Sequence, residues 1–311
     1  MLVTEGWFVD RSLHPLFRPI QMNGTDRNTY YIEQIPSISL MAHVACYWES
    51  GSIPHTGEQD QEPISVPARV LPDGCTDMLI TYDSVRSAHS YVYCGNYTHP
   101  FAVPEAFDVS PSADYTFGVR FFPGGAYVFH GLPLEGFTDM RIPLEECWPV
   151  RLNELQERIA GTRIFEERVQ VMNAYLSPLS VQTNTYENDL MKNALHRIFI
   201  DGGRMSVSEL AMREVVSERQ LHRKFAEWIG ISPKRFSEVV RFHRVLGSIH
   251  QGHTADGVAL ALNHGFFDQA HLIRQFRKFY GETPLTAAKE HQQRLSDLYN
   301  KSVAPSDILR S

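Results

Sequence analysis

The sequence predicts an α+β chain of several domains. An N-terminal antiparallel β-barrel domain with flanking helices precedes an all-α domain, in which a long helix joins two helix-turn-helix units. Two observations support this fold class. Short runs of β-branched and aromatic residues, separated by turn signals, occupy much of the first 150 residues. Residues 206–233 and 254–284 then repeat one pattern: a short helix, a tight turn, a capped basic helix and a Gly-x-Ser/Thr-Pro exit.

Charge separates the two halves of the chain. The net charge is −7 over 311 residues, a length that suits two ordinary domains. Residues 1–200 hold 13 basic and 24 acidic residues, whereas residues 201–311 hold 16 basic and 12 acidic ones. Within 219–244, seven basic residues stand against two acidic ones. The C-terminal half is therefore the part expected to approach phosphate groups, through a local basic patch.

The cysteines and the hydropathy pattern indicate a cytoplasmic protein. The four cysteines are widely spaced and form no CxxC pair, which is typical of reduced core thiols in the cytosol. No run of about 18 apolar residues and no signal-peptide pattern is present. We therefore expect no membrane partner.

The N-terminal part alternates strand and turn signals. Residues 1–35 are expected to form extended segments at the edge of the domain. Turn signals, among them Pro72-Asp73-Gly74, separate the apolar runs. Strands are predicted over residues 37–48, 65–71, 77–82, 90–94 and 114–122, with a short helix over 126–132.

Helical periodicity replaces this pattern after Pro133. Helices are predicted over 151–160, 163–176 and 186–200, with a loop near 176–188 and a stop at Gly202-Gly203. The first two helices suit either a dimer interface or plain packing on the barrel. The predicted domains are 1–150 (β-rich and regulatory), 151–203 (coupling or dimerisation), 204–290 (DNA-binding) and 291–311 (tail).

Each repeated unit has a capped second helix whose outward face is polar. Ser206, Ser217, Ser232 and Asp268 are predicted N-caps, and Gly230 and Gly281 helix ends. A helix in the major groove reads bases with the side chains near its N-terminus, and Arg, Gln and His have suitable donors. The side chains predicted to face DNA are Arg219, His222, Arg223, Lys224, Gln269, Ala270, His271 and Arg274. The alternative interpretation is a pair of amphipathic helical units whose charged residues only face solvent. Two capped, basic units in tandem favour DNA binding over this alternative.

These motifs resemble the DNA-binding domain of the AraC/XylS family of bacterial transcription regulators. GFFDQAHLIRQFRKFYGETP (265–284) is similar to the family signature, and SPKRFSEVVRFHRVL (232–246) to its linker helix. The resemblance implies base-reading roles for Arg219, His222 and Arg223, and for Ala270, His271 and Arg274. The chain departs from the family with Glu214-Val215 at the first turn and Gly257 in the second scaffold helix. A β-branched residue resists positive φ, so we expect the first turn to differ or to be strained.

RVLPDGCTDMLITYD (69–83) and residues 114–139 resemble a β-rich domain often found before AraC-type domains, which implies a cupin-like sensory barrel. Alternation places Thr116, Gly118, Arg120 and Phe122 on one face of a strand. Arg120 is a candidate for binding an anionic ligand, but an internal ion pair with Asp73 or Asp77 is the favoured interpretation. Aromatic residues named as further ligand candidates, which are singly more often core, are Tyr47, Trp48, Tyr82 and Tyr93.

No catalytic or metal-binding motif is found, so neither an enzyme nor a cofactor is expected. The sequence has no HxH pair, GxSxG, P-loop or GxGxxG, and Asp73–Asp77 is better explained as a turn than as a metal loop. We expect a regulator that binds double-stranded operator DNA, with a small-molecule effector, a second copy of the chain and RNA polymerase as further partners. One alternative is a ligand-independent regulator whose N-terminal domain only dimerises or docks a protein. The other is an enzymatic N-terminal domain fused to a DNA-binding module.

Overall fold

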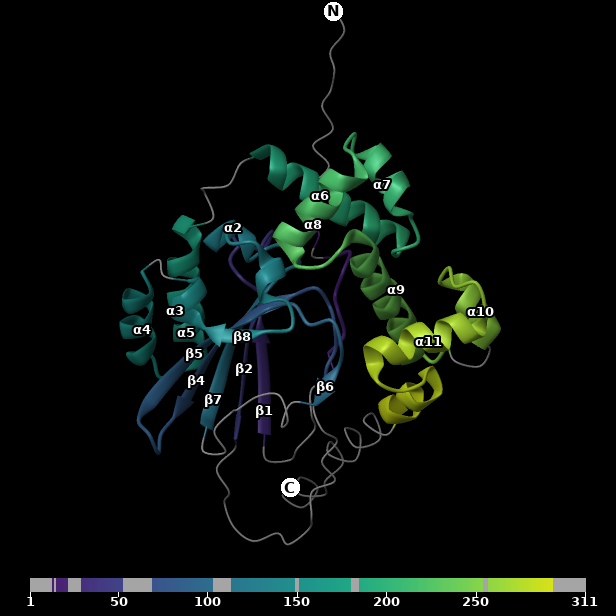
Figure 1. Cartoon of the computed structure of the whole chain (residues 1–311). Helices are drawn as coiled ribbons and strands as arrows, with labels where there is room; N and C mark the ends of the chain where they lie inside the picture. The colour runs from purple at the N-terminus through teal and green to yellow at the C-terminus, as the bar shows by residue number, and fades with distance from the viewer. Residues whose placement is uncertain are drawn as a thin grey trace, which may run out of the picture.

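A computed structural model describes residues 13, 15–21, 29–52, 69–102, 113–148, 151–179, 185–253 and 257–292. Figure 1 shows an N-terminal sheet with helices beside it and a group of C-terminal helices arranged around α9 (Pro233–His250). The predicted N-terminal antiparallel β domain with helices and the C-terminal helical domain are both confirmed. Among the described helices, none is both long and apolar enough to cross a membrane.

The main sheet has six antiparallel strands in the order β1-β2-β7-β4-β5-β8. The hydrogen-bonded order starts at β1 and ends at β8, and a separate ribbon pairs β3 with β6. The predicted strand over 37–48 begins later, because residues 38–43 form turns before β2. The strand predicted over 65–71 falls partly on residues 65–68, outside the described residues. The strand bounds are β1 (Thr29–Gln34), β2 (Val44–Ser52), β3 (Arg69–Val70), β4 (Thr76–Asp83), β5 (Ala88–Cys94), β6 (Phe101–Ala102), β7 (Ala113–Phe121) and β8 (Arg141–Pro143).

One face of this sheet forms the core of the N-terminal part. The alternation predicted for β7 holds: Phe117, Val119 and Phe121 are fully buried there. The helices α4 (Leu152–Ala160) and α5 (Phe165–Leu176) close this core with Leu155, Ile159, Val169 and Met172. In this chain they pack on the sheet, which was one of the two interpretations of their apolar faces. Between β7 and α4 lie α2 (Tyr127–His130), η1 (Leu134–Phe137) and α3 (Leu144–Cys147), and η2 (Ser177–Leu179) follows α5.

The helix α6 (Thr185–Asp201) packs with the C-terminal helices rather than with the sheet core. Leu195, Ile198 and Phe199 share a buried cluster with Leu221 and Phe225. A segment predicted as one coupling region over 151–203 is thus divided between two cores. The remaining helices are α7 (Val207–Arg213), α8 (Glu218–Ile229), α9, α10 (Gly257–Asn263) and α11 (Gln269–Tyr280), and residues 284–292 are also helical.

All four predicted N-caps are present. The hydroxyl oxygens of Ser206, Ser217 and Ser232, and a carboxylate oxygen of Asp268, each accept a backbone N–H of the following turn. Ser217 also forms a reciprocal capping box with Gln220. At the start of α7, the Glu209 side chain instead accepts hydrogen bonds from Arg213. Both Gly230 and Gly281 end their helices in the left-handed conformation. These local signals set where α8 and α11 begin, and hence which side chains lie near their N-termini.

The N-terminal domain holds α9 through a buried histidine. Nδ1 of His243 accepts the Ile20 N–H at 3.2 Å, so the proton is on Nε2, which donates to the Pro72 carbonyl at 2.8 Å. Two residues after Pro72, Gly74 has φ +78, and a Cβ there would lie 2.5 Å from the Phe236 ring of α9. Position 74 therefore requires glycine for two reasons: the left-handed backbone conformation and the close approach of the Phe236 ring.

The same domain also contacts both ends of the helical domain. Asn96 Nδ2 donates to the Ile229 carbonyl at 3.1 Å, and the Thr138 hydroxyl donates to the Gly230 carbonyl at 2.8 Å, both at the C-terminal end of α8. Far along the chain, Arg69 donates to the Tyr280 carbonyl at 3.2 Å at the end of α11. The N-terminal domain thus touches both helix-turn-helix units as well as the helix between them.

Two half-buried histidines, His43 and His130, make stability depend on pH. Burial lowers the pKa of His130 to about 4, and burial together with the Lys192 charge lowers the pKa of His43 to about 4. In an unfolded chain both titrate near pH ~6.5. Because the unfolded state binds more protons between these values, the free energy of unfolding is expected to fall as the pH drops from about 6.5 towards 4. Urea unfolding at several pH values measures this. In a His130→Phe variant the free energy of unfolding should fall less steeply over this pH range, whereas the exposed-site control His222→Phe should behave as the wild type does. An equal decline in all three proteins would contradict the role of His130 in this pH dependence.

Candidate nucleic-acid interface

The N-terminal half of α8 presents an exposed polar face. Its inward face is formed by Leu221, Phe225 and Trp228, which are all buried. This packing leaves the predicted reading residues Arg219, His222 and Arg223 exposed. Arg223 makes one loose ion pair with Glu227 at 3.7 Å. Three side chains with hydrogen-bond donors therefore project from the part of the helix that would meet base edges.

Lys224 does not belong to this exposed face. Its side chain is buried, and Nζ lies 2.7 Å from carboxylate oxygens of both Glu187 on α6 and Glu227 on α8. Position 224 is three residues after Leu221 and next to Phe225, so it falls at the border of the apolar stripe and turns inward. The prediction that Lys224 faces DNA conflicts with this position.

The basic patch predicted over 219–244 also contains fewer exposed basic side chains than the seven basic residues in that range. Arg235 donates to the Thr98 carbonyl, Arg241 to the Gly203 carbonyl and Arg244 to the Phe199 carbonyl. With Lys224, four of the seven basic residues hold the fold together. The exposed basic residues that make none of these internal contacts are Arg219, Arg223 and Lys234.

The second helix predicted to read DNA, α11, is built in the same way. Leu272, Phe276 and Phe279 are buried, whereas Gln269, Ala270 and Arg274 are exposed. His271 is half-buried: Nδ1 accepts the Phe267 N–H at 3.5 Å, and its ring meets Phe266 edge-on. In the scaffold helix α10, Leu260 and Ala261 are buried, whereas Val258 is 53% exposed.

The first turn contains the strained residue that the sequence suggested. Val215 has φ +56 and is 90% exposed, whereas the equivalent turn of the second unit uses Gly265 at φ +73. Its neighbour Glu214 has a buried side chain that accepts a hydrogen bond from Arg197 on α6. The charge of Glu214, which departs from the family pattern, is therefore paired with Arg197. Val215 remains in an unfavourable left-handed conformation.

Replacing Val215 with glycine is expected to stabilise the chain by about 1 kcal/mol. A left-handed conformation costs a non-glycine residue about 1–3 kcal/mol, and the added flexibility of glycine in the unfolded chain offsets part of that gain. Chemical unfolding measures the difference. The matched control is Val258→Gly in helix α10, which should destabilise; a loss of stability in both variants would contradict the strain.

The long helix α9 separates the two units. It has 18 residues, so it spans about 27 Å at 1.5 Å per residue. Figure 1 shows α7 and α8 near one end of α9, and α10 and α11 near the other. Contacts from the N-terminal domain reach the C-terminal ends of α8 and α11. The named residues that stay exposed in the N-terminal halves of these helices are Arg219, His222, Arg223, Gln269, Ala270 and Arg274.

The five residues named as ligand candidates lie on two sides of the sheet. Tyr47 and Tyr93 are fully buried in the core beneath the helices, and Tyr82 stacks on Tyr115 on that same side. Trp48 and Arg120 lie on the opposite side, where both bond to Asp77. The five residues therefore do not line a common cavity.

Arg120 forms the internal ion pairs that the sequence favoured. Its Nε and Nη2 donate to the two Asp77 oxygens at 3.1 and 3.3 Å, and Nη1 lies 3.8 Å from Asp73. Burial raises the pKa of Asp77, and the positive charge of Arg120 offsets part of this rise. The guanidinium is thus engaged by two carboxylates of its own domain.

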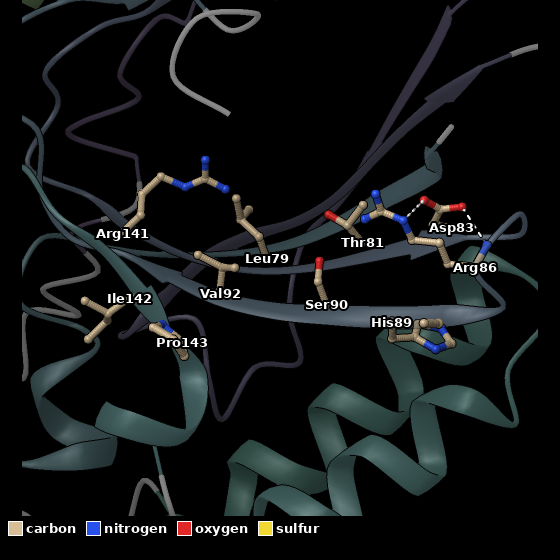
Figure 2. Close-up of a pocket in the computed structure, with 11 residues that line it drawn as sticks. Leu79, Thr81, Asp83, Arg86, His89, Ser90, Val92, Arg141, Ile142 and Pro143 are labelled. Carbon is tan, nitrogen blue, oxygen red and sulfur yellow. Dashed lines mark hydrogen bonds and ion pairs between the residues drawn. The ribbon is translucent and has the colours of Figure 1, made fainter. Parts of the chain in front are cut away.

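A groove of about 360 Å³ lies on this second side of the sheet, over β4, β5 and β8. Figure 2 shows Arg141 at one end and Arg86 at the other, with Leu79 and Val92 between them and the hydroxyls of Thr81 and Ser90 nearby. Arg86 Nε forms an ion pair with Asp83 Oδ2 at 3.7 Å. None of the five predicted ligand residues lines this groove, and only the register of β4 with β5 could have indicated it.

Comparisons with known proteins match the same two parts of the chain. The family model described as "Helix-turn-helix domain" (HTH_18) matches residues 194–290, and "Domain of unknown function (DUF6597)" matches residues 32–143. Among curated proteins, no match is found.

Several solved structures are similar to the chain. One is an AraC-type transcriptional regulator from Chromobacterium violaceum, 22% identical, covering 35% of this chain and 98% of its own, with a TM-score of 0.33. Another is ToxT from Vibrio cholerae O395, 10% identical, covering 86% of this chain and 97% of its own, with a TM-score of 0.36. A third is wild-type ToxT of Vibrio cholerae strain SCE256 with bound unsaturated fatty acid, 11% identical, covering 88% and 97%, with a TM-score of 0.37.

Proposed function

The chain is a DNA-binding regulator with an AraC-type helix-turn-helix domain behind a DUF6597 domain, and we propose that a small molecule bound by the DUF6597 domain controls it. In this proposal the protein is cytoplasmic, and α8 and α11 bind the same operator DNA. The N-terminal domain has no catalytic role. A second copy of the chain and RNA polymerase are proposed as further partners on the family resemblance alone.

The observation that carries DNA reading by both units is the exposed N-terminal half of each capped helix. On α8 these positions are Arg219, His222 and Arg223, and on α11 they are Gln269, Ala270 and Arg274. Selection of bound sequences from a random DNA pool tests the proposal. A single enriched motif with two separated conserved blocks is expected, and its affinity should fall steeply with salt because phosphate contacts release counterions. Enrichment of no motif would overturn it.

Ligand control is supported by the groove over β4, β5 and β8. A volume of about 360 Å³ lies within the usual range for small-molecule sites, ~300–1,000 Å³. The floor is apolar at Leu79, Val92 and Pro143, and the charge of Arg141 lies at one end. The proposed effector is accordingly an amphipathic anion that places its acidic group at Arg141.

A thermal-shift screen of amphipathic acids on the full chain tests this site. A compound that raises the melting temperature of the wild-type chain, but not that of Arg141→Met, supports the proposal. A ligand can shift the regulator only if it binds one arrangement of the domains more tightly than another, so operator affinity should change with the same compound. If no acid shifts the melting temperature, the N-terminal domain is better described as a dimerisation or protein-docking module.

A further inference from the structure

The two helix-turn-helix units approach each other beside α9. The Gly202-Gly203 turn leads from α6 into α7 and lies against α9, where a Cβ at Gly203 would lie 2.2 Å from the Ser237 carbonyl oxygen. In the second unit, Gly265 belongs to the turn before α11, and a Cβ there would lie 2.8 Å from the Arg204 side chain. The entry to the first unit and the turn of the second therefore meet next to this helix.

Arg241, the ninth of the 18 residues of α9, bonds to both units at once. Its Nη2 donates to the Gly203 carbonyl at 2.5 Å, and its Nη1 donates to the Gly265 carbonyl at 3.3 Å. The same guanidinium lies over the Phe266 ring, with Cζ 5.4 Å from the ring centroid. Phe266 is 5% exposed and packs in the buried cluster of the second unit. One side chain in the middle of α9 thus connects the entry to the first unit with the core of the second.

The apolar contacts of α9 hold the two units separately. The first unit packs on Phe236 and Val240 through one buried cluster. The second packs on Phe242 and Leu246 through another. Apolar packing is not directional, whereas a planar guanidinium has donors in fixed directions. Hydrogen bonds from one guanidinium to a carbonyl of each unit therefore restrict how the units are placed relative to each other.

From these contacts, we propose that Arg241 is a positioning residue, which sets the distance and angle between α8 and α11 and hence the number of base pairs between the two operator blocks. This role rests on DNA reading by both units, which is part of the proposed function. One base pair inserted between the blocks displaces one of them by ~3.4 Å along the DNA axis and turns it by ~35°. Such a shift exceeds the ~2.7–3.2 Å donor–acceptor distance of a hydrogen bond to a base, so rigidly placed helices bind well at one spacing only.

Titration of the full chain with selected operators that differ by one or two base pairs between the blocks tests this role. Wild-type affinity should fall at least about tenfold for one inserted or deleted base pair, since a single mismatched base pair costs about 5- to 150-fold. Arg241→Met should bind the original operator more weakly, and its affinities at the different spacings should become nearly equal. Arg241→Lys, a milder change that keeps the charge but not the planar fork, should lose the spacing preference as well.

The matched control is Arg244→Met, three residues further along α9. Arg244 donates to the Phe199 carbonyl of α6, on the side of the first unit. This control should keep the wild-type spacing optimum. In every variant, binding of DNA that carries only one block should match the wild type, which shows that each unit folds.

The outcomes separate this role from the proposed function. A spacing optimum that stays as sharp in both Arg241 variants as in the wild type would overturn the role of Arg241 alone. An equal loss of the optimum in Arg244→Met would overturn it too, as would a loss of single-block binding in both Arg241 variants. A wild-type chain without any spacing optimum would instead contradict DNA reading by both units, and the role of Arg241 with it.

Discussion

Replacing Arg168 with methionine is expected to lower the free energy of unfolding by about 3–5 kcal/mol, the cost of leaving a buried charge without its partner. Arg168 on α5 and Glu49 on β2 are 3% and 4% exposed, and Arg168 Nε lies 2.7 Å from a Glu49 oxygen. Its guanidinium also lies over the Tyr115 ring at 4.1 Å. The Tyr30 hydroxyl supplies Glu49 with one further hydrogen bond but no positive charge. The ion pair therefore fastens α5 to the sheet.

Urea unfolding of the full chain measures this effect. The matched control is Arg158→Met, which breaks a pair with Glu154 that is about half exposed and should cost less than about 1 kcal/mol. The double variant Glu49→Leu/Arg168→Met removes both charges and should recover part of the loss, because no buried carboxylate remains unpaired. Equal losses in Arg168→Met and Arg158→Met would contradict the role of the buried pair.

Removing one arginine from each reading helix is expected to weaken operator binding strongly. Arg223→Ala and Arg274→Ala should each cost about 1–3 kcal/mol of specific affinity, the usual value of a good base contact. Both side chains are exposed, near the N-terminal ends of α8 and α11. Because the two sites lie on separate units, the losses should add in the double variant to about 2–6 kcal/mol. Titration of selected operator DNA at fixed salt measures all three variants.

Lys224→Met provides the contrast within the same helix. Its ammonium is bound to Glu187 and Glu227, so this variant should lose stability and keep the sequence preference. A large loss of specificity in Lys224→Met, with Arg223→Ala unchanged, would reverse the assignment of the two faces of α8.

The sequence predicted the helical domain well because its signals are local. Caps such as Ser217 and Asp268 act within one turn, and the apolar spacing of α8 and α11 sets which side faces inward. What it could not predict is the fate of single charged residues. Lys224 differs from Arg223 only by one position on the helix, and its burial depends on Glu187 from a different helix.

In the N-terminal domain, alternation predicted which residues of β7 share a face, but not what covers each face. Tyr47 and Tyr93 were grouped with Trp48 as ligand candidates because all are aromatic and lie on strands. The register of β2 with β7 places Tyr47 opposite Val119 and Trp48 opposite Gly118, on opposite sides of the sheet. Such pairing joins segments about 70 residues apart, and no local pattern encodes it.

A footprint of the full chain on its selected operator, at base resolution, tests the central claim most directly. Reading by both units predicts two protected major-groove segments on the same side of the DNA, about one helical turn or ~34 Å apart. Protection of the first should be lost in Arg223→Ala and protection of the second in Arg274→Ala. A single protected groove that both variants affect equally would contradict the claim that α8 and α11 read DNA together.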